Sequence, residues 1–584
     1  MKLIFRYLKK YGGAVILVLF IKLIATMSEL LLPYILEYII DDIVPRNDLK
    51  RVIFWGVMMF AVAFLCRTFN VIANTRAIHN AHQISYEVRQ SLFEKTMNLT
   101  GEQFDAFSLP SLISRMTSDS YNVQSAVQQF QTLCVRAPIL LIGGIAVAMF
   151  MDRQLALIMV GIMPLLVLII LFISSRGIPL YANVQAKLDT VVRIMRENIT
   201  GIRVVKALSK EDYEIRRFKK ANEEMKQMDV KAATIMAIPS PLMQMCLNMG
   251  LTLVVLIGAS RVNQGVMKPG VILAFLTYFN MIAMGVMGLN RIFMTLSKAS
   301  ASADRIDEVL QSENRELLTE AVHDTVESEE AVRFDHVSFS YGEGSDNAED
   351  FAGETRQNAL DDISFVLKKG ESLGIIGPTG SGKTTIVNLM MRFYDADTGL
   401  VSVDGRPVST YGRKELRGKF GTVFQNDMIF QDTLEENIIF GREMTADDIT
   451  LAVKSAMADE FIDSLSEGLN YEAAIKGANL SGGQKQRILV SRALAAKPEI
   501  LILDDSSSAL DYKTDAAMRK AIRENYPDAT LVMIAQRVSS VMNMTNILVL
   551  DNGRCIGFGT HEELMEHCAP YRDICEIQMG AMQE

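Results

Sequence analysis

Gly377-Pro-Thr-Gly-Ser-Gly-Lys-Thr-Thr385 lies between an apolar run, Leu373–Ile376, and a helical pattern over Thr384–Phe393. A strand, a glycine-rich loop and a helix in this order form the context of a phosphate-binding loop. Glycines let backbone N–H groups approach phosphate oxygens that a Cβ would keep away, and the helix N-terminus adds partial positive charge. The residues predicted to surround the phosphates are Gly377, Pro378, Thr379, Gly380, Ser381, Gly382, Lys383, Thr384 and Thr385.

Magnesium ligands are expected beside this loop. In P-loop proteins the lysine reaches the β- and γ-phosphates and the following hydroxyl binds Mg²⁺, roles that fall here to Lys383 and Thr384. A second apolar strand, Ile500–Leu503, ends in Asp504 and Asp505. Such a strand delivers a carboxylate to the metal, so Asp504 is a further candidate ligand. The sequence therefore predicts a site for a nucleoside triphosphate with Mg²⁺.

A second anion-binding element follows further along the chain. Leu480-Ser-Gly-Gly-Gln-Lys-Gln-Arg487 precedes an amphipathic helical pattern. The backbone N–H groups of Ser481, Gly482 and Gly483 at the start of a helix can bind an anion. Because the two elements are separated in sequence, two chains that face each other head to tail could each complete the other's site.

The first half of the chain has the composition of a membrane domain. Of the 584 residues, 49% are hydrophobic, and the first half contains several runs long enough to cross a bilayer at ~20 residues each. We expect about six spanning helices. The first begins near Gly13 and continues past Leu32, and the others are Val52–Ala73, Ala137–Met151, Leu155–Ser175, Ala232–Ser260 and Pro269–Leu289.

Positive charge predicts the orientation of these helices. Lys2, Arg6, Lys9 and Lys10 precede the first run, which has no clear small-residue cleavage site, so it is interpreted as a retained helix with a cytoplasmic N-terminus. The first, third and fifth connections are short, whereas the second and fourth are long, charged and helical in pattern. We therefore expect the even connections in the cytoplasm, with membrane helices that continue into them, in a bacterial-type inner membrane.

Polar groups within the expected spans leave two interpretations open. Lys22, Glu29 and Arg67 either face a cavity or partner, or extend to the interface, which is the interpretation we favour for Glu37. The last two spans are rich in methionine, which suits ordinary packing and also a cavity for varied apolar substrates.

Composition excludes several other classes. The net charge of −9 shows no basic surface, so no nucleic-acid partner is expected. The six cysteines contain no CxxC pair, which indicates thiols in a reducing compartment, and the six histidines form no metal cluster.

The chain divides at an acidic stretch, Asp304–Glu330. We expect a membrane domain over residues 1–310, a linker over 311–331 and a nucleotide-binding domain over 332–584. A second polar stretch, Gly342–Gln357, is interpreted as a surface excursion. Apolar runs separated by helical stretches predict a layered α/β domain with parallel strands. These runs are Val332–Phe334, Ile363–Leu367, Leu373–Ile376, Ile500–Leu503, Leu531–Ile534 and Ile547–Leu550.

Together these residues resemble a half-transporter of the ATP-binding cassette exporter family over nearly the whole length. The matching motifs are Gly377–Thr385, Gln425, Leu480–Gln484, Asp504 and Ser508–Asp511, and Tyr341 matches the aromatic residue that stacks on adenine. In the membrane half, Ser114-Arg115 with Asp119, and Gly201–Ala207, resemble the loops that dock onto the nucleotide-binding domains.

The resemblance implies a mechanism. Two chains would hold ATP between one P-loop and the Leu480–Gln484 segment of the other, in which Ser481, Gly482, Gly483 and Gln484 contact the nucleotide. Thr384, Gln425 and Asp504 would serve Mg²⁺. Closure on ATP would switch a membrane cavity from inward- to outward-facing, and hydrolysis would reset it.

Two departures from the family pattern concern the hydrolytic step, and a third alters a contact that couples the domains. The position of the catalytic glutamate is Asp505, the switch histidine is replaced by Gln536, and the usual acidic turn before the signature reads Ala474–Gly477. A shorter carboxylate lies about one methylene further from the attacking water, and glutamine cannot carry the histidine's charge. These departures predict a weakly hydrolytic site whose intact signature serves a second half-transporter, as in bacterial heterodimeric multidrug exporters of hydrophobic or amphipathic compounds.

Other functions remain open at this point. One is a homodimeric lipid or peptide exporter with two slow sites. Another is an ATP-gated channel or regulator, which the poor hydrolytic chemistry fits and the intact signature opposes. A soluble P-loop ATPase acting on DNA is excluded by the long uncharged spans.

Overall fold

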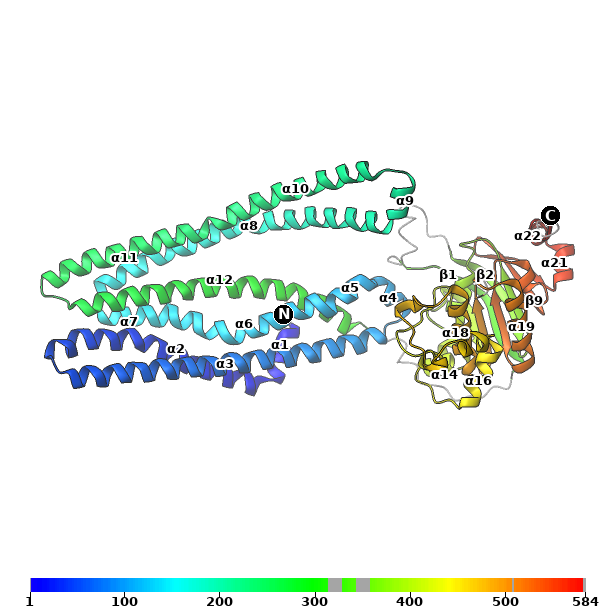
Figure 1. The fold of residues 1–584 in the computed structure, drawn as a ribbon, viewed down its shortest axis with the longest axis horizontal. Coiled ribbons are helices and arrows are strands. Elements are labelled where there is room, and N and C mark those ends of the chain that lie inside the picture. Colours follow the sequence, from blue (N-terminus) through cyan, green and yellow to red (C-terminus); the bar gives the residue numbers. More distant parts are fainter. Residues whose placement is uncertain (1, 313–327, 343–357, 507–508, 581–584) are drawn as a thin grey trace. The chain divides into compact units, whose positions relative to one another are not determined.

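The computed structural model describes residues 2–312, 328–342, 358–506 and 509–580, which fall into two compact units (Figure 1). The first unit comprises Met1–Phe93 and Ile113–Gln311, and the second comprises Glu94–Leu112 and Ser312–Glu584. Most of the expected linker and of the polar stretch before residue 358 lies outside the described residues, as does Ser508. The domain boundaries expected from composition stay a prediction.

The first unit is built from helices over its described residues. In chain order they are α1 (Lys2–Lys10), α2 (Gly12–Tyr38), η1 (Ile39–Ile43), η2 (Val44–Arg46), α3 (Leu49–Met97, whose end belongs to the second unit), α5 (Leu109–Ser114), η3 (Arg115–Asp119), α6 (Ser120–Pro138), η4 (Ile139–Gly143), α7 (Gly144–Met151), α8 (Arg153–Thr200), α9 (Ile202–Ala207), α10 (Glu211–Ala237), α11 (Pro239–Asn263) and α12 (Pro269–Gln311).

By length and composition, 5 stretches of helix in the described residues could cross a membrane. They are Gly12–Arg46, Leu49–Met97, Leu109–Met151, Glu211–Asn263 and Pro269–Gln311. The sixth expected span lies in α8, where Arg153–Ile169 is a shorter apolar segment, so six spans stay a prediction. Because α3 has 49 residues and α8 has 48, these helices are far longer than the ~20 residues that a bilayer requires.

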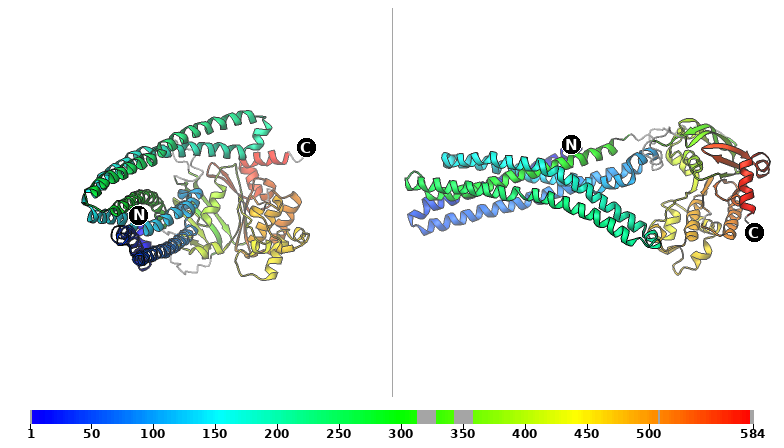
Figure 2. Two further views of the ribbon diagram at one scale, coloured as in Figure 1. Left: turned by 60° about the vertical axis from the view of Figure 1, so that its left-hand side comes forward. Right: turned by 90° about the horizontal axis from the view of Figure 1, so that it is seen from above.

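Two sets of helices pack side by side within this unit. The long helix α12 packs against α2 and α6, while α8 packs along α10 and α11 (Figures 1 and 2). The buried side of α12 carries Phe275, Tyr278 and Phe279, and the Tyr278 hydroxyl donates to the Leu30 carbonyl at 2.7 Å. This bond satisfies a phenol that the packing removes from solvent.

Of the four charged residues noted in the expected spans, Lys22 and Glu29 have hydrogen-bonding partners inside the protein. Lys22 is buried and donates to Asn70 Oδ1 at 2.7 Å and to Asn74 Oδ1 at 2.9 Å. Glu29 Oε1 accepts from Arg136 Nη2 at 2.9 Å. Arg67 is exposed in this chain and forms no ion pair with the described residues. Lys22 and Glu29 therefore face other helices rather than the membrane interface.

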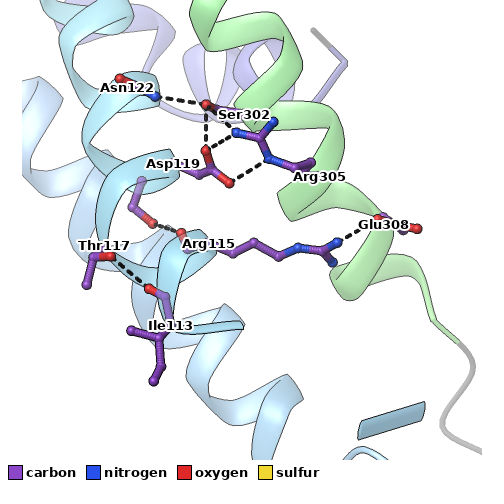
Figure 3. A network of polar contacts seen from close by, with 9 residues as sticks. Ile113, Arg115, Thr117, Asp119, Asn122, Ser302, Arg305 and Glu308 are labelled. Atoms are coloured by element: carbon purple, nitrogen blue, oxygen red, sulfur yellow. Dashed lines mark hydrogen bonds and ion pairs between the residues drawn. The ribbon is translucent and has the colours of Figure 1, made fainter. Parts of the chain in front are cut away.

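A polar network joins the π-helical turn η3 to the end of α12 (Figure 3). Asp119, buried in that turn, accepts from Ser302 Oγ at 2.8 Å and from Arg305 Nε at 2.9 Å. Arg115 Nη2 donates to Glu308 Oε2 at 2.9 Å. Arg115 and Asp119, which resemble part of a docking loop, belong to the helical unit, and the segment that groups with the second unit ends at Leu112, just before them.

The second unit is an α/β fold. Its strands are β1 (Glu330–Phe339), β2 (Leu360–Lys368), β3 (Ser372–Ile376), β4 (Thr398–Val403), β5 (Arg406–Pro407), β6 (Phe420–Val423), β7 (Ile500–Asp504), β8 (Thr530–Ile534), β9 (Asn546–Asp551) and β10 (Arg554–Gly559). Its helices are α4 (Gly101–Phe107), α13 (Lys383–Met390), η7 (Val408–Thr410), α14 (Arg413–Gly418), α15 (Leu434–Ile439), α16 (Ala446–Ser455), α17 (Asp459–Asp463), η8 (Gly468–Asn470), η9 (Ile475–Gly477), α18 (Gly482–Ala495), α19 (Tyr512–Asn525), α20 (Val538–Val541), α21 (His561–His567) and α22 (Ala569–Gly580).

The described strands form two sheets. One has the order β2-β1-β4-β5 and is antiparallel, and the other has the order β10-β9-β3-β8-β7-β6, in which β9, β3, β8, β7 and β6 are parallel. All six predicted strands exist. The prediction of parallel strands was wrong for β1 and β2, and β4, β5, β6 and β10 were not predicted.

The parallel sheet has a hydrophobic core on each face. One core includes Phe334 of β1, Ile386 of α13 and Ile502 of β7. The other includes Leu503 of β7, Ile488 of α18 and Met518 of α19. Because both faces are covered, the carboxyl ends of β3 and β7 are the open edge at which a ligand can bind.

Candidate nucleotide site

The glycine-rich loop connects β3 to α13 with the backbone that its glycines permit. Gly380 and Gly382 have φ of +83° and +96°, in the left-handed region that L side chains rarely adopt. A Cβ at Gly377 would lie 2.2 Å from the Leu550 carbonyl oxygen, and one at Gly382 would lie 2.6 Å from the Ala359 carbonyl oxygen. The loop is therefore held tightly against neighbouring backbone.

The polar groups of this loop fit a triphosphate. Lys383 Nζ donates to the carbonyls of Gly377 at 2.9 Å and Pro378 at 2.7 Å, so the ammonium lies over the loop. Burial lowers the pKa of Lys383, against the opposing effect of Asp504 and Asp505. Ser381 is buried, and its Oγ bonds to none of the described residues. A cation and a buried hydroxyl in a glycine cradle suit phosphate oxygens.

Two of the three predicted magnesium ligands lie together. Thr384 Oγ1 donates to Asp504 Oδ2 at 3.0 Å, which joins the start of α13 to the end of β7. Burial raises the pKa of Asp504, because a carboxylate there is poorly solvated. A hydroxyl and a carboxylate are oxygen donors of the kind that Mg²⁺ prefers. Gln425 lies exposed in the turn after β6 and makes no hydrogen bond to either of them among the described residues.

Asp505 and Gln536, the two departures from the family pattern, are in contact. Gln536 Nε2 donates to Asp505 Oδ2 at 3.0 Å. Burial raises the pKa of Asp505, although Lys383 and the Gln536 amide oppose this effect. Asp505 has φ of +50°, a strained conformation that aspartate tolerates better than most residues. The structure therefore brings the two predicted catalytic side chains together beside Asp504.

Tyr341 is anchored to the P-loop helix. Its hydroxyl lies 3.1 Å from Thr385 Oγ1 and accepts from Asn388 Nδ2 at 3.3 Å. Its ring packs edge-on against Phe339 and Tyr394, with centroid separations of 4.9 Å and 5.2 Å. The predicted adenine-stacking residue is thus held beside α13.

The signature begins α18. Ser481 is the N-cap residue, its Oγ accepts from Gln484 N at 3.3 Å, and Gln484 Oε1 accepts from Ser481 N at 2.8 Å. This capping box fixes the start of the helix, where Gly482 and Gly483 present their N–H groups. The two side chains thereby have a structural role in addition to their expected contact with nucleotide.

Two residues that contact the elements of the nucleotide site were not predicted from the sequence. Gln486 Nε2 donates to the Asp505 carbonyl at 3.4 Å, and Gln486 Oε1 accepts from Ala509 N at 3.1 Å, which connects α18 to Asp505. Tyr394 donates to Asp105 Oδ2 of α4 at 2.5 Å. In the sequence, the only indication of a role for Gln486 is its place in the Lys-Gln pair directly after the signature. No sequence pattern indicates a role for Tyr394.

Comparison with known proteins agrees with this geometry. Residues 15–286 match the family described as the ABC transporter transmembrane region, and residues 360–508 match the family described as ABC transporter. The chain is 33% identical over 575 residues to an uncharacterized ABC transporter ATP-binding protein of Bacillus subtilis, YfiB, and covers 98% of each chain. It is 31% identical over 587 residues to another from Mycobacterium tuberculosis, Rv1273c, with 98% of this chain and 97% of the relative covered.

The fold is also similar to a solved structure, a bacterial Atm1-family ABC exporter with ATP bound. The TM-score is 0.78 at 21% identity, with 98% of each chain covered. This chain therefore belongs to the ATP-binding cassette transporters, as a multi-pass membrane protein with the exporter fold whose fused ATPase domain couples ATP and Mg²⁺ to transport.

Proposed function

We propose that this chain is the weakly hydrolytic subunit of a heterodimeric exporter that moves hydrophobic or amphipathic compounds out of the cell. The partner would be a second half-transporter that supplies a catalytic glutamate and a switch histidine. In this proposal the membrane is a bacterial inner membrane, and the N-terminus and the nucleotide-binding domain are cytoplasmic.

The observation that carries the proposal is the 3.0 Å contact between Gln536 Nε2 and Asp505 Oδ2. A general base must lie within hydrogen-bond reach of the attacking water, and here the carboxylate is one methylene shorter and already accepts from an amide. Gln536 can bond to a phosphate oxygen, but it cannot become a cation. Both residues therefore favour binding of ATP over its hydrolysis.

The remaining ATP contacts fit a site that still binds nucleotide. In this proposal Lys383 and Ser381 hold the phosphates and Tyr341 holds the base, while Thr384 and Asp504 hold Mg²⁺, with Gln425 as a third ligand after closure. When bound, the metal supplies charge neutralisation at the β- and γ-phosphates. The signature at Ser481–Gln484 would complete the partner's site.

A homodimeric exporter is the second candidate. Asp505 retains a carboxylate at the sequence position of the catalytic residue, and Gln536 holds it in one orientation, so slow hydrolysis by two identical sites is chemically feasible. The two proposals differ in what the chain does alone.

The test is ATP turnover by the purified chain alone, by Asp505→Glu/Gln536→His, and by the chain with a partner half-transporter. We expect the lone wild-type chain to be at least about 100-fold slower than the double variant, which is the usual contribution of a general base. Brisk turnover with transport by the lone wild-type chain would instead establish the homodimer.

The role of the signature needs a matched control. Ser481→Ala should abolish turnover of the heterodimer, but it also removes a helix cap worth about 1 kcal/mol. Thr445 caps α16 with the same reciprocal arrangement, so Thr445→Ala removes an equivalent cap. If Thr445→Ala lowers turnover as much as Ser481→Ala does, loss of stability explains both results and the signature role fails.

A further inference from the structure

The C-terminal helix α22 contacts the segment that carries Gln536. Gln578 Nε2 donates to the Gln536 carbonyl at 3.0 Å, and Gln578 Oε1 accepts from Val538 N at 2.8 Å. Arg537, between these two residues, has extended backbone, with φ −103° and ψ 128°. The carbonyl of residue 536 and the N–H of residue 538 therefore point to the same side, as they do on the edge of a strand.

An amide side chain suits this pair of bonds, because it carries a donor and an acceptor side by side in one plane. The Val538 N–H begins α20 and has no partner within that helix, so Gln578 also satisfies a group that would otherwise be orphaned. The side-chain amide thus fixes the backbone on both sides of Arg537 and thereby the position from which the Gln536 side chain extends to Asp505.

Gln578 itself is held by the packing of α22. Tyr571 and Cys575 are fully buried, and with Gln578 they recur at helical spacing on one face. The Tyr571 hydroxyl lies 2.8 Å from His561 Nδ1 of α21. Ile577, by contrast, is 73% exposed. Packing of α22 therefore fixes the position of Gln578, so a shift of α22 would move the segment Gln536–Val538.

We propose that Gln578 is a positioning residue through which α22 sets the geometry of the Asp505–Gln536 pair. This inference rests on the proposed role of Gln536 as the switch residue. It makes the C-terminal helix a control element of the ATPase, separate from the residues that bind nucleotide.

The direct test is hydrogen exchange of the full-length protein in the peptide that contains Val538. In Gln578→Ala this amide should exchange about fivefold faster than in wild type, because its acceptor is lost. Ile577→Ala, on the same turn of α22, should leave the exchange unchanged. If Gln578→Ala and wild type exchange at the same rate, the proposed contact is refuted. If Ile577→Ala accelerates exchange as much as Gln578→Ala does, the acceleration results from disturbed helix packing.

The functional test separates positioning from folding. It is made in whichever of wild type and Asp505→Glu/Gln536→His turns over faster, so the rate is measurable even if the proposed weakness of the site is wrong. Gln578→Ala should lower kcat about tenfold with KM for ATP within about twofold, and Gln578→Glu, which keeps only the acceptor, should be intermediate. An unchanged kcat, or equal effects on kcat and KM, would overturn the proposal.

Discussion

The phenolic hydroxyl of Tyr394 donates a 2.5 Å hydrogen bond to Asp105 Oδ2. Asp105 lies on α4, a short helix between α3 and α5, and the Gly101 N–H of the same helix donates to the Phe393 carbonyl at 3.2 Å. The ring of Tyr394 packs edge-on against Tyr341, whose hydroxyl contacts α13. The segment around α4, which groups with the second unit, is thereby linked through two tyrosines to the helix that begins with the P-loop lysine.

Tyr394→Phe should weaken coupling between transport and ATP turnover. The substitution keeps the ring against Tyr341 and removes only the bond to Asp105. We expect the free energy of unfolding to fall by about 1.5–3 kcal/mol, the usual contribution of a hydrogen bond to a charged group. We also expect transported compounds to stimulate the ATPase less. Thermal unfolding measures the loss of stability, and ATP turnover with and without substrate in the reconstituted heterodimer measures the loss of stimulation.

Tyr411→Phe is the matched control. Its hydroxyl donates to the Val403 carbonyl of β4 at 2.8 Å, so its loss should reduce stability without changing stimulation by substrate. Full stimulation in Tyr394→Phe, or equal loss in both variants, would refute a coupling role for the Tyr394 bond.

Asp504→Asn should separate metal binding from stability. The substitution keeps an oxygen that can accept from Thr384 and removes the charge that Mg²⁺ needs. We expect the Mg²⁺ affinity of the ATP-bound protein to fall by about tenfold or more, since loss of even an outer partner of a metal ligand costs that much. Thermal unfolding with ATP and Mg²⁺, compared with ATP and EDTA, measures the change, and an undiminished Mg²⁺ effect would contradict the ligand assignment.

The same variant has a predicted pH dependence. Burial raises the pKa of Asp504, so as pH rises through the ordinary carboxyl range the unfolded chain releases its proton first and the folded state loses stability. Without nucleotide, Asp504→Asn should therefore be more stable than wild type at neutral pH, and the difference should vanish below about pH 4. A difference that instead grows as pH falls would show the opposite sign of pKa shift.

Arg305→Met should destabilise the helical unit. The change leaves the buried Asp119 carboxylate with the Ser302 hydroxyl and without its guanidinium partner. Because Arg305 is half exposed and solvent screens the pair, we expect a cost of about 1–3 kcal/mol by thermal unfolding. The control is Lys226→Met, which breaks the exposed ion pair with Glu223 and should lower the free energy of unfolding by less than about 0.5 kcal/mol. Equal losses in the two variants would mean that the network in Figure 3 contributes no more than a surface ion pair.

The Glu29–Arg136 pair should show strong coupling. Glu29→Gln leaves an uncompensated cation between helices and should cost about 1–3 kcal/mol, whereas Glu29→Gln/Arg136→Gln should be less harmful than either single change. Unfolding of the four proteins in detergent gives the interaction free energy. Simple additivity would show that the two charges do not stabilise each other.

Several features follow from contiguous residues. The loop from Gly377 to Thr385 could be assigned from sequence because its glycine positions, the preceding apolar strand and the following helix are all local. The strand that delivers Asp504 was equally clear, since an apolar run that ends in carboxylates is a local signal. The antiparallel sheet was not foreseen, because strand direction depends on which neighbours pair, and β1 pairs with both β2 and β4.

Pairs between distant residues required the folded chain. Gln578 is one ordinary glutamine among many in the sequence, and nothing beside it indicates that its amide contacts the backbone around Arg537. No sequence pattern indicates that Tyr394 contacts Asp105 or that Arg305 contacts Asp119. The conformation of a phosphate-binding loop is set by the residues of the loop and its immediate neighbours, so it can be predicted from sequence. A hydrogen bond between separate elements forms only when packing of the hydrophobic core brings its two atoms within about 3 Å.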